Sequence, residues 1–65
     1  MKALPQFGCY AEIDEGVLFT APMKLDESLP TTDDWSEVVS AEPAFLEAVN
    51  REFGTAFSPN QFFGR

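Results

Sequence analysis

The chain has 65 residues, of which 11 are Asp or Glu, four are Lys or Arg and none is His, so its formal net charge is −7. A chain of this length forms one domain at most, and such an excess of carboxylates repels nucleic acid and attracts basic surfaces. Direct nucleic-acid binding is disfavoured because it needs Lys and Arg to neutralise phosphates. Without histidine, the usual zinc sites and the histidine-based hydrolase triads are excluded.

The composition favours a folded domain over a disordered acidic tail. Hydrophobic residues make up 45% of the chain and include seven Phe, one Tyr and one Trp. Aromatic side chains bury large areas, whereas disordered acidic segments are poor in them. The single cysteine, Cys9, indicates a reducing compartment. With no signal-peptide pattern and no apolar run long enough to span a membrane, we expect a cytoplasmic protein that forms a single domain over residues 1–65.

The first segment with a clear pattern, residues 7–23, predicts a β-hairpin by its alternation of apolar and other side chains. Asp14, Glu15 and Gly16 fit a three-residue loop closed by a glycine bulge. This loop pairs Ile13 with Val17, and the pairing places eight residues on one face, which must be the core face: Phe7, Cys9, Ala11, Ile13, Val17, Phe19, Ala21 and Met23. Tyr10 then belongs to the opposite face.

The next segment, residues 24–34, is polar and rich in turn-forming residues, and indicates a surface connection. Residues 35–39 fit two structures. Their alternation favours a third strand, which a lone hairpin needs for stability. Thr32, followed by Asp33 and Asp34, instead fits the start of a short helix. We favour the strand.

Residues 41–53 carry the clearest helical pattern, with Ser40 as the expected N-cap and Gly54 as the terminator. Glu47 and Arg51 have the spacing of an ion pair on the exposed side. Ser58 begins a capping-box pattern that predicts a short final turn with Phe62 and Phe63. The fold expected is α+β: a small antiparallel sheet packed on one main helix, over a core of Phe7, Ile13, Val17, Phe19, Phe45, Leu46, Val49 and Phe53.

No pattern of catalytic residues is present. The carboxylates lack the spacing of a calcium loop, and Cys9 has no histidine to activate it. The alternation around Cys9 instead predicts a small core residue. We therefore expect no enzyme activity, no metal site and no cofactor.

The carboxylates are the candidate binding groups, because Lys and Arg that hold phosphates also pair with carboxylates. Tyr10 and Trp35 are candidate aromatic anchors, of a type enriched at interface hot spots. The predicted partner-binding residues are Tyr10, Glu12, Asp14, Glu15, Asp26, Glu27, Asp33, Asp34, Trp35 and Glu37. An acidic surface that only keeps a small protein soluble is the alternative interpretation.

In size, acidity, single-domain build and lack of catalytic residues, the chain resembles small inhibitors encoded by phages and mobile elements, notably anti-CRISPR and DNA-mimicking anti-restriction proteins. The resemblance concerns the general character of the whole chain and no specific motif. It implies an inhibitor that covers a basic surface of a nucleic-acid-binding protein in the host cytoplasm, such as the subunit of a CRISPR surveillance complex that reads the protospacer-adjacent motif. The alternative is a structural or assembly module without an inhibitory role, such as a homodimer that pairs through an open sheet edge or through exposed Phe; a monomer is favoured.

Overall fold

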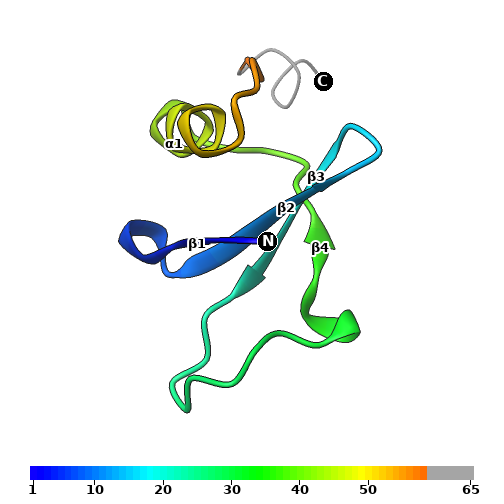
Figure 1. Ribbon diagram of the computed structural model, residues 1–65, viewed down its shortest axis with the longest axis vertical. Helices are drawn as coiled ribbons and strands as arrows, with labels where there is room; N and C mark the ends of the chain where they lie inside the picture. Colours follow the sequence, from blue (N-terminus) through cyan, green and yellow to red (C-terminus); the bar gives the residue numbers. More distant parts are fainter. Residues whose placement is uncertain (59–65) are drawn as a thin grey trace.

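The structure is a computed structural model that describes residues 1–58. One antiparallel sheet holds four strands side by side in chain order (Figure 1): β1 (Lys2–Leu4), β2 (Cys9–Asp14), β3 (Val17–Pro22) and β4 (Ser36–Glu37). The helix α1 (Pro43–Phe53) lies over one face, and two short 3-10 helices complete the fold: η1 (Pro5–Phe7) and η2 (Thr32–Asp34). The predicted α+β class is confirmed. The predicted final turn with Phe62 and Phe63 lies outside the described residues.

The register of the β2–β3 hairpin differs from the prediction by one residue. Val17 pairs with Asp14, and Ile13 pairs with Leu18. The loop therefore has two residues, Glu15 and Gly16, with φ angles of 53° and 80°. Positive φ at both central positions is the hallmark of a type I′ turn, whose twist matches that of the strands it joins. The three-residue loop expected from the sequence was wrong because Asp14 belongs to the strand.

The shift moves half of the predicted core of the hairpin to the other face, because side chains alternate along a strand. Leu18 is only 2% exposed and packs with Ala11 in the core, whereas Val17 and Phe19 are half-buried on the face away from the helix. Their predicted place in the core was wrong. Phe7 is also more exposed than predicted, at 37%.

The turn residue Glu15 offers a stability test. A residue other than glycine at positive φ is strained, and Asn tolerates this conformation far better than Glu. We expect Glu15→Asn to raise the free energy of unfolding by about 0.5–1 kcal/mol, and the melting temperature by a few degrees. Thermal unfolding followed by circular dichroism measures the change. Glu15→Gln removes the same charge without favouring positive φ, so an equal gain in that control would contradict the explanation.

The core lies between the sheet and α1. Its buried members are Leu4, Ala11, Leu18, Ala41, Leu46 and Val49, and half-buried Cys9, Ile13, Val38, Phe45, Phe53 and Phe57 pack against them. The predicted helical stripe and the predicted core position of Cys9 are therefore confirmed. The ring of Phe7 meets that of Phe45 edge-on, with centroids 5.3 Å apart. This contact joins η1 to α1.

The ends of α1 agree with the sequence in part. Pro43 opens the helix and Glu42 occupies the N-cap position, so the assignment of Ser40 was wrong. At the other end Gly54 adopts φ 68° and donates its N–H to the carbonyl of Asn50, as a glycine terminator does. Within the described residues, Glu47 forms no ion pair with Arg51, which corrects that prediction.

Two segments on either side of the hairpin complete the sheet. Lys2–Leu4 forms the edge strand β1, which the sequence did not predict, and Leu4 becomes one of the most buried side chains. Around residues 32–39 both interpretations hold in part, because the short helix η2 is followed, after Trp35, by the short strand β4. No helix in the described part of the chain is long and apolar enough to cross a membrane.

Candidate protein-binding face

The face of the sheet opposite α1, called here the outer face, gathers half of the predicted partner-binding residues. Strand pairing aligns side chains across a sheet, so partners in the register share a face. Glu12 on β2, Phe19 on β3 and Glu37 on β4 form one row across this face. By register the outer face consists of Ala3, Tyr10, Glu12, Asp14, Val17, Phe19, Ala21 and Glu37, of which Ala21 is buried, and Trp35 borders it.

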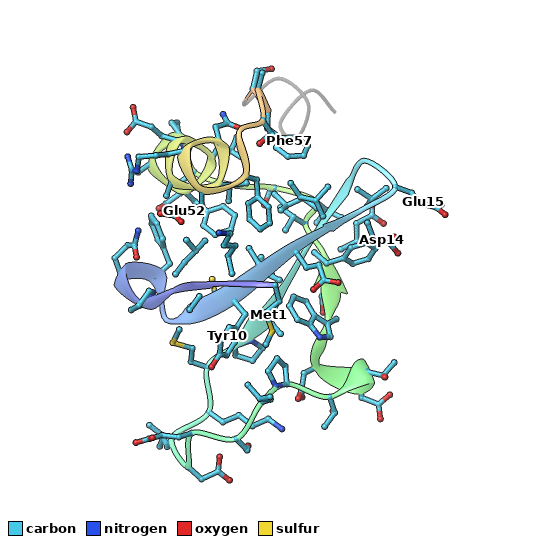
Figure 2. All side chains as sticks on the ribbon, viewed as in Figure 1. Met1, Tyr10, Asp14, Glu15, Glu52 and Phe57 are labelled. Carbon is cyan, nitrogen blue, oxygen red and sulfur yellow. The ribbon has the colours of Figure 1, made fainter. Side chains whose placement is uncertain are left out.

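A small depression, called here the outer pocket, lies on this face. Its volume is about 200 Å³, and it is lined by Glu12, Asp14, Phe19 and Trp35. The two carboxylates come from β2, while the phenyl ring comes from β3 and the indole from the residue before β4. The pocket therefore has an acidic wall and an aromatic wall. Figure 2 shows Asp14 and Tyr10 among the side chains around the sheet, away from α1.

The three carboxylates of the outer face are exposed, and among the described residues only that of Glu12 has an ion-pair partner. Glu12 Oε1 lies 3.3 Å from the amino group of Met1, and about half of the Glu12 side chain is exposed. The carboxylate of Asp14 makes no ion pair or hydrogen bond with the residues that the structure describes. An exposed ion pair such as that of Glu12 contributes little free energy and is screened by salt. Both carboxylates are thus open to a cationic partner.

Basic side chains lie elsewhere in the described part of the chain. Lys2 pairs in register with Ala11 and so belongs to the helix side of the sheet. Lys24 forms an ion pair with Asp34, and Arg51 lies in the last turn of α1. Among residues 1–58, therefore, the Met1 amino group near Glu12 is the one positive charge placed near the carboxylates of the outer face.

The other predicted binding residues lie away from the outer pocket. Glu15 occupies the hairpin turn next to Asp14. Asp26 and Glu27 belong to the long connection between β3 and η2, which extends toward the end of the molecule opposite α1 (Figure 1). Asp26 Oδ1 accepts hydrogen bonds from the backbone N–H of Ser28 at 3.0 Å and from its hydroxyl at 2.8 Å, and these bonds lower the pKa of Asp26.

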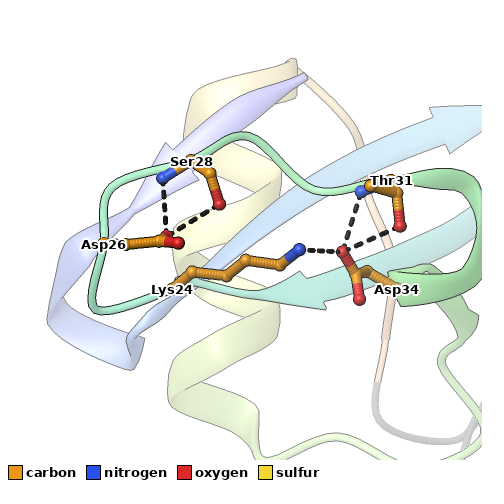
Figure 3. Close-up of polar contacts among 5 residues, drawn as sticks. All are labelled: Lys24, Asp26, Ser28, Thr31 and Asp34. Atoms are coloured by element: carbon orange, nitrogen blue, oxygen red, sulfur yellow. Dashed lines mark hydrogen bonds and ion pairs between the residues drawn. The ribbon is translucent and has the colours of Figure 1, made fainter.

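Asp33 and Asp34 belong to η2, and Asp34 has a structural role (Figure 3). Asp34 Oδ2 accepts the backbone N–H of Thr31 at 2.8 Å and the Thr31 hydroxyl at 3.1 Å, and it lies 2.9 Å from Lys24 Nζ. The bond from the Thr31 backbone and the contact with Lys24 both hold the pKa of Asp34 below its ordinary value. Since Lys24 follows β3, this cluster ties the connection to the sheet.

The Asp34 cluster predicts a pH dependence of stability. A carboxyl group whose pKa is lower in the folded state stabilises the fold above its unfolded pKa, near 3.9, and loses that effect as the pH falls through the folded value. We expect the Asp34→Asn variant to have a lower melting temperature than the wild type at about pH 7, and this difference to disappear as the pH falls below about 4. Thermal melting curves recorded across this pH range measure the difference. Asp33→Asn is the matched control; an equal, pH-independent change in both variants would contradict the role of Asp34.

A second depression lies on the helix side of the sheet, beside the end of β4. It has a volume of about 420 Å³, and its lining includes Phe7, Cys9, Thr20, Val39 and Phe45. Burial raises the pKa of the Cys9 thiol, which keeps it protonated at neutral pH. Glu37 borders this depression as well as the outer face, because β4 is the edge strand.

Sequence reasoning missed Phe19 as a member of the site and missed the pocket itself. Gly16 is compatible with a two-residue turn and hence with the observed register, but Glu15 is not a residue that favours positive φ, so the sequence carries only a weak signal for either. No protein-family model, curated protein or solved structure matches this chain.

Proposed function

We propose that this protein binds a basic protein surface through its outer face, and that it inhibits a nucleic-acid-binding complex in the cytoplasm by occupying the groove that holds the nucleic acid. The observation that supports the proposal is the grouping of Glu12, Asp14 and Glu37 with Phe19 and Trp35 on one face. A face of this kind combines charge that attracts a basic groove with aromatic surface that anchors the contact.

The physical basis is shared chemistry. A groove lined by Lys and Arg holds phosphates by charge and by hydrogen bonds, and carboxylates on a rigid sheet can take the same positions. The net charge of −7 adds long-range attraction, which speeds the encounter at low salt. A subunit of a CRISPR surveillance complex remains a candidate partner under this proposal. The protein itself makes no direct contact with nucleic acid in this mechanism.

Self-association through a sheet edge gains little support from the fold. The alternative assembly role rests on the surplus of aromatic residues and on a sheet short of strands, whereas the described sheet has four strands. Its edge strands β1 and β4 are three and two residues long. Such short edges leave few backbone groups for pairing with a second copy.

The experiment that tests the proposal is a pull-down from bacterial lysate, washed first at low salt and then at about 0.5 M salt, where exposed charges are screened within a few ångströms. We expect a nucleic-acid-binding protein to elute at the second wash, and nucleic acid of its preferred kind to compete with the bait. Glu12→Lys/Asp14→Lys protein serves as the control bait. Recovery of the same proteins by both baits, or of the bait alone, would contradict the proposal.

A further inference from the structure

We propose that the outer pocket receives an arginine side chain of the basic partner. This inference rests on the proposed function and deepens it, because it names the chemical group recognised and the residues that recognise it. The pocket brings together two carboxylates and two aromatic rings: those of Glu12, Asp14, Phe19 and Trp35.

The two walls of the pocket fit a guanidinium group. Glu12 and Asp14 lie two residues apart on β2, so both carboxylates project to the outer face. Phe19 is the register partner of Glu12, and Trp35 completes the aromatic wall. A guanidinium is planar, so one face stacks on an aromatic ring while its edge donates N–H groups to a carboxylate. The volume of about 200 Å³ accommodates one such side chain.

Arginine fits this pocket better than lysine. A lysine ammonium is compact and strongly hydrated, and leaves water less readily than a guanidinium. Its three N–H donors also lack the fork that pairs with both oxygens of one carboxylate. Tryptophan is the strongest cation–π partner among the aromatic side chains, and Trp35 is half-buried, so part of its ring is accessible to a partner.

The charge around the pocket points to the same occupant. Asp14 has no partner among the described residues, and the Glu12 contact with the amino group is an exposed one of 3.3 Å that a guanidinium can replace. Glu37, the register partner of Phe19 on β4, adds a further carboxylate to the outer face. The Lys and Arg side chains of residues 1–58 lie away from this face. The side chain that complements its carboxylates is therefore a cation of another molecule.

The test compares two peptides with the same number of charges: acetylated hexa-arginine and acetylated hexa-lysine, each titrated into the full chain by calorimetry. Trp35 is the only tryptophan, so its fluorescence reports whether the peptide reaches the pocket. We expect hexa-arginine to bind about threefold or more tightly than hexa-lysine and to change the Trp35 emission. Trp35→Leu is expected to abolish this preference, and Asp14→Asn to reduce it. Glu47→Gln, an equal loss of charge on α1, should leave it unchanged.

Each outcome decides the inference. Equal affinity for the two peptides in the wild type, or an arginine preference that survives in Trp35→Leu, would overturn it. Circular dichroism shows whether Trp35→Leu folds; if it does not, a preference unchanged by Asp14→Asn overturns the inference instead. Salt-sensitive binding without a preference for arginine would contradict the arginine site in the outer pocket, but it would be consistent with the proposed function. The lysate experiment, which does not depend on arginine preference, then decides the proposed function separately.

Discussion

Replacing Leu18 by alanine is expected to lower the free energy of unfolding by about 2–5 kcal/mol, the usual cost of deleting a buried leucine side chain. Leu18 is 2% exposed and packs in the core with Leu4, Leu46 and Val49. A domain of 65 residues has a total free energy of unfolding of only about 3–10 kcal/mol. The variant should therefore lose about half of its free energy of unfolding and unfold at a much lower urea concentration. Urea denaturation followed by circular dichroism measures the loss.

The matched control is Val17→Ala, one position earlier on the same strand. Val17 is half-buried on the outer face, so its truncation should cost about 1 kcal/mol or less. The pair also tests the hairpin register, because in the register with a three-residue loop Val17 faces the core and Leu18 does not. A larger loss of stability in Val17→Ala than in Leu18→Ala would contradict the two-residue turn at Glu15 and Gly16.

The double variant Glu12→Lys/Asp14→Lys is expected to weaken binding to the basic partner by about 100-fold or more at low salt, because like charges placed together at an interface cost several kcal/mol. Both substitutions lie on the exposed outer face, so the fold should be retained. The loss should shrink as salt rises, since exposed charges are then screened. Calorimetry or surface plasmon resonance with the captured partner, at two salt concentrations, measures both effects.

The control for this variant changes the net charge equally at a different place. Glu47 and Glu52 are exposed on α1, which covers the opposite face of the sheet, and Glu47→Lys/Glu52→Lys adds the same positive charge. We expect a modest loss of affinity from the weaker long-range attraction alone. Equal losses in the two double variants would show that net charge, and not the outer face, governs binding. In that case the acidic surface acts without a defined site.

Much of the architecture follows from local patterns. The alternation in residues 7–23 requires a hairpin, and the apolar stripe of α1, ended by Gly54, requires a helix, because each pattern leaves one apolar side that must be covered. Composition determined the acidity and the lack of histidine. The strand β1 could not be predicted, because a segment of three residues is too short to show an alternation of apolar and polar side chains. Only its pairing with β2 makes it a strand.

The sequence by itself determined the kinds of element and the excess of carboxylates, but only the tertiary structure decided which face each hairpin residue occupies. Both sides of β3 are largely apolar, since Val17, Phe19 and Ala21 alternate with Leu18 and Pro22, so periodicity permits either register. The choice rests on the turn and on packing against α1. That choice brings Phe19 between Glu12 and Glu37. The charge of the protein can be counted from its sequence, whereas the pocket depends on contacts between residues that are far apart in the chain.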